Sequence, residues 1–359
     1  MDVGLNSGQL ALRDAVRDVL RTECPPGVAR QAMTDPERWR PLWKTVVDLG
    51  WTELARPGAD DFGRLDLAVV AEECGAAIAP IPLLSSVGLA AGALRAAGPA
   101  ADEVLHQIGG GAVAALAVHP PGARLPGVPM TLQRGRLRGR AVAVAELCRA
   151  ELVVTLAADG DGVVVAVAHT GDGVAVTPVD CINPAQPVAD VDIDTIPVLT
   201  APVDLQAALG TPLMAAAADL VGVAGAALAR SVEHAKSREQ FGKPIGAFQG
   251  VKHALADNYV SLERARSLTY AAAARLDDPG TTPAAGWIAA ALAKAAAGDA
   301  AVGCARTAVQ VHGAIAQTWE HDVHLYLRHA WQTAAALGDS HGLYHDVGRR
   351  WAGDDAGER

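Results

Sequence analysis

Residues 237–249, Ser-Arg-Glu-Gln-Phe-Gly-Lys-Pro-Ile-Gly-Ala-Phe-Gln, combine side chains that could bind a phosphorylated ligand. They include one arginine, two glutamines and two of the three phenylalanines in the chain: Arg238, Gln240, Gln249, Phe241 and Phe248. An arginine fork beside a helix that starts near Gln249 suits a diphosphate, because guanidinium groups and helix N-termini both bind phosphate oxygens. An ordinary helix-helix connection with a surface cation is the alternative that these residue types leave open.

Two blocks of residues in this half of the chain resemble a known family. The first reads Arg-x-x-Phe-Gly-x-Pro-Ile-x-x-Phe-Gln over 238–249, and Leu-Ala-Asp follows at 255–257. The second contains Val-Gln-Val-His-Gly at 309–313, Thr-Trp-Glu-His-Asp at 318–322 and Leu-Tyr-Leu-Arg at 325–328. In this order and spacing the blocks resemble the acyl-CoA dehydrogenases. The resemblance covers the whole chain, and it is clearest after residue 210 and weakest between about 110 and 200.

The resemblance implies a flavin-dependent reaction on an acyl-CoA thioester, which needs a carboxylate base. In the family, the base takes a proton from the carbon next to the thioester while a hydride passes from the adjoining carbon to FAD. The family's usual glutamate aligns with Leu337, and the family's other location for the base aligns with 210–214, Gly-Thr-Pro-Leu-Met. Neither place has a carboxylate, so we predict no catalytic residue in this chain. Asp339 is kept as an alternative base, although an aspartate here is also suited to capping the next helix.

The residues that would contact the flavin ring in the family are also replaced. Where family members carry Thr-Glu-Pro and a later Gly-Ser-Asp, this chain has Val-His-Pro at 118–120 and Gly-Ala-Arg at 122–124. Where they carry Trp-Ile-Thr, this chain has Ala-Val-Ala at 143–145. We therefore expect the middle domain to keep its shape without its ligand contacts.

The part of the family's motif that binds the diphosphate is complete in this sequence. By resemblance, it holds the ADP half of the FAD of the neighbouring subunit. Its residues are Arg238, Gln240, Phe241, Phe248, Gln249, Gln310, His312 and Gly313. A chain with this half alone is similar to the degenerate chains of actinobacterial α2β2 acyl-CoA dehydrogenases, which complete a catalytic partner's FAD site.

This resemblance implies an enzyme complex that forms an α,β double bond in an acyl-CoA, with an electron-transfer flavoprotein as its acceptor. Similarity to the degenerate chains points to a bulky acyl group, such as a steroid side chain. Two alternatives stay open: a self-sufficient homo-oligomeric dehydrogenase that uses Asp339 or another carboxylate, and a flavin-free binding or scaffold protein on the same fold.

Two other clusters of polar residues invite a chemical interpretation. Glu320, His321, Asp322 and His324 are residue types that bind metals, but the same run is an ordinary part of this flavin family, so we predict no metal site. Glu72 and Glu73 are adjacent on a predicted helix and diverge by about 100° around it, so they do not converge on one substrate atom. We interpret them as surface residues.

The composition excludes several classes of protein. The 359 residues carry a net charge of −10, which argues against nucleic acid or an anionic membrane as a partner. Five scattered cysteines without CxxC spacing indicate reduced thiols in a cytoplasmic protein. The first 22 residues alternate charged with apolar residues and do not resemble a signal peptide, and charges interrupt the alanine-rich runs, so we expect no transmembrane helix.

Three patterns along the chain predict a multidomain α+β fold. Residues 1–111 carry helical periodicity, with helices expected at 8–21, from 35 to 50 and at 65–78. Residues 112–203 contain short valine-rich runs with glycine and aspartate turns, which predict a small antiparallel β-barrel or sandwich. Residues 204–359 return to helix and predict a four-helix bundle with small residues at its contacts.

Overall fold

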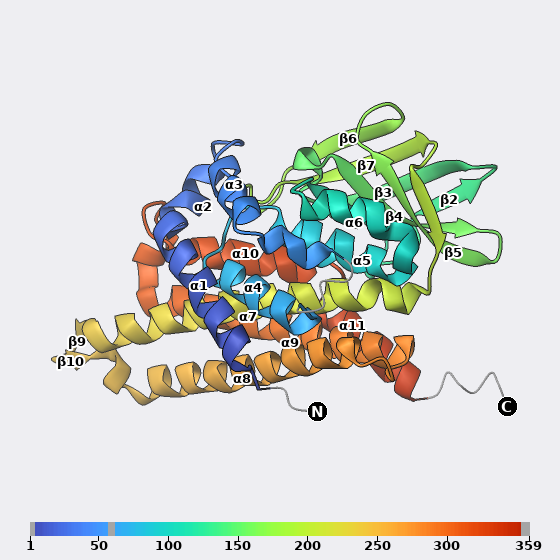
Figure 1. Cartoon of the computed structure of the whole chain (residues 1–359). Coiled ribbons are helices and arrows are strands. Elements are labelled where there is room, and N and C mark those ends of the chain that lie inside the picture. The colour runs from blue at the N-terminus through green and yellow to red at the C-terminus, as the bar shows by residue number, and fades with distance from the viewer. Residues whose placement is uncertain (1–3, 57–61, 353–359) are drawn as a thin grey trace.

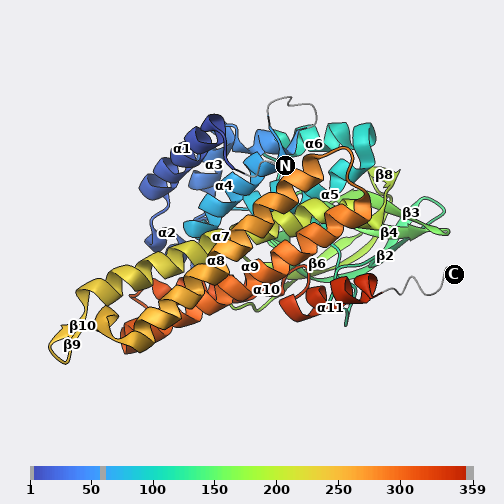
Figure 2. The same ribbon diagram turned by 90° about the horizontal axis from the view of Figure 1, so that it is seen from below.

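The computed structural model describes residues 4–56 and 62–352. It has the predicted multidomain organisation, with amino-terminal helices, a middle β-sheet and a carboxy-terminal helical bundle (Figure 1). The bundle is formed by α7 (Leu205–Ser237), α8 (Gln249–Asp277), α9 (Pro283–His312) and α10 (Val323–Ala335), followed by α11 (Ser340–Trp351). Figure 2 shows α7, α8 and α9 running side by side along the length of the molecule.

The described residues of the amino-terminal part form helices joined by turns. Its elements are α1 (Ser7–Glu23), α2 (Pro26–Ala32), α3 (Arg40–Asp48), η1 (Trp51–Ala55), α4 (Arg64–Ala76), the π-helical segment η2 (Leu84–Ala91), α5 (Gly92–Leu94), η3 (Arg95–Ala101) and α6 (Asp102–Gly109). The three helices expected from periodicity are present as α1, α3 and α4. The short α2 was missed; it starts at a Pro-Pro pair, and proline is well tolerated at the first position of a helix.

The middle part is a mixed eight-stranded sheet. Its strands are β1 (Ala114–Ala117), β2 (Met130–Gln133), β3 (Arg136–Ala145), β4 (Leu152–Asp159), β5 (Gly162–His169), β6 (Val174–Val179), β7 (Val188–Thr195) and β8 (Leu199–Pro202). The order is β6-β7-β3-β2-β4-β5-β8, and β1 pairs with β4. Both β1 and β2 pair with β4 in parallel, so the expectation of a purely antiparallel sheet was wrong. The division into domains at residues 112 and 203 stays a sequence prediction.

The amino-terminal helices are joined to the bundle by a very close contact between α4 and α7. A Cβ atom on Gly75 of α4 would lie 2.0 Å from the Asp219 carbonyl oxygen, and one on Gly222 of α7 would lie 1.8 Å from the Glu72 carbonyl oxygen. The two backbones therefore meet with no side chain between them at these positions. Only glycine permits such an approach, because every other residue carries a Cβ atom.

The two glutamates of α4 extend this contact to neighbouring helices. Glu73 is buried and pairs with Arg17 of α1 at 2.7 Å. Glu72 accepts hydrogen bonds from Arg266, at 3.0 Å, and from the Tyr270 hydroxyl, at 2.8 Å, both on α8. Their interpretation as surface residues was wrong, because the close approach of α4 to the bundle covers both carboxylates.

Two helices of the bundle are apolar enough and long enough to cross a membrane by length and composition alone. They are α7 and the stretch Pro283–Gln317, which contains α9. In this fold, 83% and 67% of their apolar windows are buried against other elements. A core helix passes the same test when its apolar surface faces the protein interior, so burial accounts for their composition.

We predict that Gly222→Ala destabilises the chain by roughly 2–3 kcal/mol, because the added methyl group would force α4 and α7 apart. Gly225→Ala, three residues along the same helix, is the matched control. The nearest atom to its added Cβ is the Arg266 Nη2, at 3.5 Å, which is ordinary contact. Chemical denaturation of both variants checks this difference, and an equal effect at the two positions would contradict it.

Candidate functional site

The predicted diphosphate cradle lies at the end of the bundle farthest from the sheet. A two-stranded hairpin, β9 (Glu239–Gln240) and β10 (Lys243–Pro244), connects α7 to η5 (Ile245–Ala247) and α8, and it projects beyond the helices (Figures 1 and 2). Phe241 and Gly242 form the turn, with φ values of 53° and 77°. Two successive residues in the left-handed backbone conformation are typical of a tight two-residue hairpin turn. The turn leaves Phe241 90% exposed.

The cradle residues come from three helix ends. Arg238 is the C-cap of α7, Phe248 is the N-cap of α8, and Gly313 is the C-cap of α9. Two aromatic contacts join these ends: His312 stacks on His234 of α7 with ring centroids 4.2 Å apart, and Phe241 meets Phe248 edge-on at 6.1 Å. The structure thus brings both predicted motif blocks, 238–249 and 310–313, to the same end of the molecule.

Most polar side chains of the cradle are not used to hold the chain together. Among the described residues, the side chains of Arg238, Gln249 and Gln310 have no hydrogen-bond or ion-pair partner. The Gln240 amide donates only to the neighbouring Glu239 carbonyl oxygen. Lys243 lies over the Phe248 ring, 4.4 Å from its centroid. A free guanidinium and two free amides at one exposed end are available to a ligand from outside the chain.

Beside Ala216, toward the middle of α7, a small cavity is lined by residues that include Leu337, the position aligned with the family's usual base. Leu337 lies beside Leu84 and Leu89 of η2 and Ala145 at the end of β3. The cavity volume is about 40 Å³. One water molecule needs about 10–15 Å³ of such volume, whereas sites for small-molecule ligands measure roughly 300–1,000 Å³. This cavity has room for a few water molecules and is far smaller than a ligand site.

Leu337 is fixed in an unusual conformation at the cavity wall. Its φ is 56°, and its side chain is buried. Its backbone N–H donates to the His119 Nε2 at 3.2 Å. Burial, with a smaller contribution from Lys294, lowers the pKa of His119, which keeps its ring neutral and able to accept this bond. His119 lies where the resemblance implies a flavin contact, and here it supports the backbone at Leu337, the position aligned with the family's usual glutamate.

Lys294 of α9 also supports this segment, and the sequence analysis missed it. Its ammonium group is fully buried and donates to the carbonyl oxygens of Ala334, at 2.6 Å, and Gly338, at 2.7 Å. Burial lowers its pKa to about 7, and the nearby Asp339 opposes this shift. A neutral amine still has two N–H groups for these two carbonyl oxygens. Lys294 therefore holds the end of α10 whether or not it is charged.

Asp339, the alternative base, occupies the N-cap of α11. Its carboxylate accepts a hydrogen bond from the Gly342 N–H at 2.7 Å. It does not line the cavity next to Leu337. The structure thus gives Asp339 the capping contact that an aspartate before a helix usually makes.

Glu146 is a buried carboxylate in the cavity wall that the sequence analysis did not single out. It follows β3 with a left-handed φ of 61° and is 3% exposed. Burial raises the pKa of Glu146 to about 7, and the positive charge of Arg149 only partly offsets this increase. Its Oε1 atom has no hydrogen-bond partner among the described residues. A buried acidic group with a free oxygen is a feature of many catalytic sites, but it also occurs in structural ion pairs.

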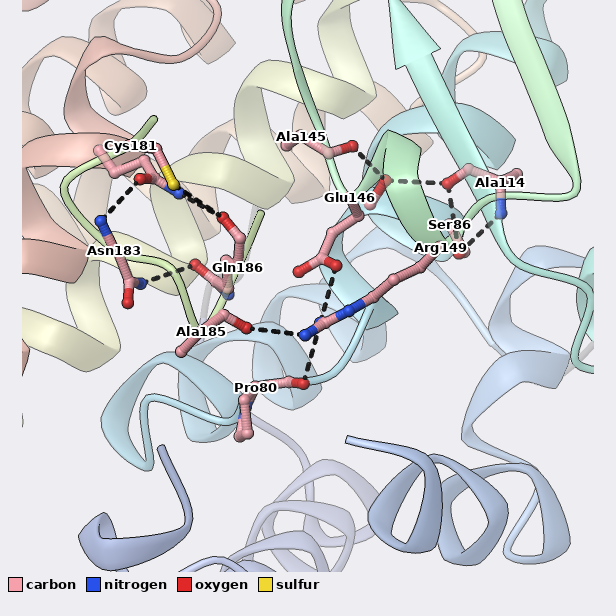
Figure 3. Close-up of polar contacts among 12 residues, drawn as sticks. Pro80, Ser86, Ala114, Ala145, Glu146, Arg149, Cys181, Asn183, Ala185 and Gln186 are labelled. Carbon is pink, nitrogen blue, oxygen red and sulfur yellow. Dashed lines mark hydrogen bonds and ion pairs between the residues drawn. The ribbon is translucent and has the colours of Figure 1, made fainter. Parts of the chain in front are cut away.

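The other oxygen of Glu146 is held by a buried arginine, as Figure 3 shows. The Arg149 Nη1 lies 2.8 Å from the Glu146 Oε2, and both side chains are almost fully buried. The same guanidinium donates to the carbonyl oxygens of Pro80 and Ala185. The pair thereby joins the segment before η2 to the loop before β7. Nothing in the local sequence signals this role, since a Glu-x-x-Arg spacing is common on surface helices.

The suspected metal cluster at 320–324 is used within the chain. Asp322 pairs with Arg30 of α2, the His321 Nδ1 accepts the Val323 N–H at 3.2 Å, and His324 stacks on Trp319. Across residues 4–56 and 62–352, no group of three or more histidine, cysteine, aspartate or glutamate side chains is placed to hold a metal ion.

Comparison with known proteins identifies the family. The family description "Acyl-CoA dehydrogenase, N-terminal domain" matches residues 6–102, and "Acyl-CoA dehydrogenase, C-terminal domain" matches residues 206–351. The chain is 30% identical to "Acyl-CoA dehydrogenase IpdE2" of Mycobacterium tuberculosis, over 91% of this chain and 92% of that protein. It is 32% identical to "Acyl-CoA dehydrogenase FadE27" of the same organism, over 98% of this chain and 99% of that protein.

A solved structure agrees with these relatives. One chain of the ChsE4-ChsE5 complex from Mycobacterium tuberculosis superposes with a TM-score of 0.86 and 29% identity, covering 98% of this chain and 99% of that one. The fold and these relatives define a flavoprotein oxidoreductase class. This chain belongs to the acyl-CoA dehydrogenase family, whose members bind FAD.

The two parts of the chain differ in how well they fit FAD. The cradle offers unpaired polar side chains and an exposed aromatic pair to the diphosphate half. The ring would need to lie beside 143–145, where the cavity measures about 40 Å³ and is lined by Leu337 and the Glu146 carboxylate. An isoalloxazine ring does not fit there, so no step of a flavin reaction can be assigned to this chain's own cavity.

We predict that the free energy of unfolding rises between about pH 7 and about pH 9 because of Lys294. The folded chain releases its proton near pH 7, whereas the unfolded chain keeps it up to the ordinary value of 10.5. The unfolded state then binds more protons, so stability increases with pH by at most about 1.4 kcal/mol per pH unit.

Chemical denaturation at several pH values checks the Lys294 prediction. The increase should be smaller in Lys294→Met, which cannot titrate. Lys236→Met removes an exposed lysine of α7 and should leave the increase unchanged. Identical pH profiles for Lys294→Met and the parent chain would contradict the assignment.

Proposed function

We propose that this chain is the non-catalytic subunit of a heteromeric acyl-CoA dehydrogenase and completes the FAD site of a homologous catalytic chain. The FAD would be held by the partner around its ring and by this chain around its diphosphate. The complex would form an α,β double bond in an acyl-CoA. The relation to one chain of a solved two-protein complex supports a heteromeric partnership.

The observation that carries the proposal is the distance between the two halves of the site. Ala216, the twelfth residue of α7, lines the cavity, and Arg238 caps the C-terminal end of the helix. The 22 residue steps from Ala216 to Arg238 correspond to roughly 33 Å at 1.5 Å per residue. One flavin dinucleotide cannot reach from the cavity to the cradle. The cradle therefore suits a flavin whose ring is seated in another chain.

The cavity supports the same conclusion from the chemical side. Its wall has leucine at the aligned position of the base, and its volume of about 40 Å³ excludes both an acyl chain and a flavin ring. An active chain would need a carboxylate within hydrogen-bond reach of the substrate carbon. A catalytic partner would supply both the base and the ring site.

Three finer features of the proposal follow from the family resemblance. The complex would pass its electrons to an electron-transfer flavoprotein, and its substrate would carry a bulky acyl group such as a steroid side chain. The assembly would be an α2β2 heterotetramer in the cytoplasm. Assaying the purified complex with acyl-CoA substrates of different size tests the substrate class, and measuring its mass in solution tests the α2β2 assembly.

A self-sufficient dehydrogenase is a second candidate, and Glu146 is the observation that favours it. Its raised pKa and unpartnered Oε1 are properties of a general base, and it lines the same cavity as Leu337. Against this, Arg149 holds its other oxygen, and the cavity is too small for a substrate. The first candidate therefore accounts for more of the geometry.

Activity measurements separate the two candidates. We predict no acyl-CoA dehydrogenase activity and no bound flavin for the purified chain alone, and activity only after co-expression with a catalytic partner. In the complex, Asp339→Asn and Glu146→Gln should each change kcat less than about threefold. A loss of roughly a hundredfold or more in either variant would identify a general base in this chain. If neither the chain alone nor the complex contains flavin, the protein is instead a scaffold.

We predict that Arg238→Ala removes flavin from the complex while both chains remain folded. A charge-assisted contact to a diphosphate is worth roughly 1.5–3 kcal/mol, which corresponds to a tenfold to hundredfold loss of flavin affinity. Arg238→Lys should restore only part of this affinity, because an ammonium lacks the guanidinium fork.

Flavin absorbance per complex after dialysis measures the effect of the Arg238 variants. Lys236→Ala is the matched control, since it removes a cation two residues earlier that already pairs with Glu233. Retention of flavin by Arg238→Ala as tight as in the parent would show that Arg238 is an ordinary surface cation.

A further inference from the structure

A groove beside the cradle is lined by three histidines that the function proposed above does not use together. They are His234 on α7, His312 at the end of α9 and His321 in the turn before α10. The groove has a volume of about 410 Å³ and opens to solvent. Arg230 and Ser237 of α7 also line it. This volume lies in the range of sites that hold small ligands.

The three imidazole rings lie in a row with His312 in the middle, stacked on His234 and tilted against His321. The His234 and His312 centroids lie 4.2 Å apart with an angle of 26° between the rings. The His312 and His321 centroids lie 5.0 Å apart at 60°. Because ring nitrogens point along the ring planes, stacked rings do not direct their nitrogens at one point, as a metal site would require.

Hydrogen bonds decide which of these rings can accept a proton. The His312 Nδ1 donates to the Ala308 carbonyl oxygen at 2.8 Å, so its Nε2 is free to take a proton. The His321 Nδ1 accepts the Val323 N–H, and protonation there would break that bond. The His234 ring makes no hydrogen bond to another described residue. Two of the rings, His234 and His312, thus have a ring nitrogen free for a ligand, whereas the Nδ1 of His321 is already used as an acceptor.

Positive charges outnumber free negative charges around the stack. The charged groups that face it are Arg230, Glu233 and Arg238 from α7, Asp322 from the turn before α10, and Arg30 from α2. Glu233 is paired with Lys236, and Asp322 is paired with Arg30. Arg238 has no side-chain partner among the described residues, and Arg230 is bonded only to the neutral Tyr326 hydroxyl. The unbalanced charge suits an anion.

We propose that this groove binds the diphosphate of a dinucleotide together with one proton, which is taken up by the His234–His312 pair. The inference rests on the proposed function for the identity of the ligand, and it adds a proton-dependent step to cofactor retention. Binding would be tighter at mildly acidic pH than at alkaline pH.

The coupling between proton and anion follows from electrostatics. In the free chain, burial and the neighbouring His312 and Arg238 lower the pKa of His234. These influences favour the neutral form of the His234 ring in the free chain. A diphosphate in the groove would favour the imidazolium and raise that pKa. The additional affinity is complete below the pKa of the free chain and is lost as the pH rises through the pKa of the bound state.

Isothermal titration of the full chain with ADP-ribose tests this proposal. ADP-ribose carries a diphosphate diester whose charge stays constant in the range where histidine titrates. Titrations in two buffers with different ionisation enthalpies, at about pH 6 and about pH 8, give both the affinity and the number of protons taken up. We expect roughly fivefold to tenfold tighter binding at the lower pH, since each unit of pKa shift is a factor of ten.

Histidine variants locate the proton. His234→Gln combined with His312→Gln should bind with the same affinity at both pH values and take up no proton, whereas His169→Gln, an exposed histidine at the end of β5, should behave as the parent. Circular dichroism checks that the variants are folded. If the double variant is unfolded, the same titrations are made on His234→Gln and His312→Gln separately.

Three results would overturn the proposal. They are the absence of ADP-ribose binding at either pH, binding without proton uptake, and a pH dependence that survives in the folded double variant. The titration needs neither partner chain nor flavin. A negative ADP-ribose titration would therefore not contradict the proposal tested by the Arg238 variants. Likewise, normal flavin retention by Arg238→Ala would not contradict proton-coupled binding in the groove.

Discussion

The backbone contact between α4 and α7 is the constraint on which the rest of the structure depends. Gly75 and Gly222 let the two helices meet without intervening side chains, and Asp219, whose carbonyl oxygen faces Gly75, also pairs through its carboxylate with the buried His329 of α10 at 2.7 Å. The middle of α7 is thereby fixed to both neighbouring helices. Since α7 is a continuous 33-residue helix, fixing its middle also sets where its ends lie. The cavity borders the fixed part of the helix at Ala216, and the C-terminal end carries the cradle.

Features encoded by neighbouring residues could be predicted from the sequence, whereas features that depend on contacts between distant residues could not. The long helices and the cradle follow from periodicity and from contiguous motifs such as 238–249, and the structure brings those motifs together. Glu146 and Lys294 could not be found in this way. Each lies in a run of small apolar residues where a single charge resembles a solvated position, and their burial arises from elements far away in the sequence. The same applies to Glu73, whose partner Arg17 lies 56 residues earlier.

The region aligned with the family's catalytic site is filled and internally bonded. His119, at a position where the resemblance implies a flavin contact, accepts the Leu337 N–H, and Lys294 binds the carbonyl oxygens on either side of Leu337. A buried carboxylate-guanidinium pair closes the sheet side of the cavity. Such contacts stabilise a closed wall, because buried polar groups are costly unless they are hydrogen-bonded. Of the six buried side-chain polar atoms without a partner among the described residues, only the Glu146 Oε1 belongs to a residue that lines this cavity.

Filling the cavity and changing the cradle have different effects on the free energy of unfolding. An open ligand cleft in the core leaves apolar surface without packing partners, and filling it with side chains such as Leu337 increases stability. The cradle lies on an exposed end, where Arg238 and Phe241 contribute little to folding. In the non-catalytic subunit proposed above, the cleft could therefore be lost, with a gain of packing in the core, while the cradle is kept. The separation of roughly 33 Å along α7 makes changes at the cavity independent of changes at the cradle.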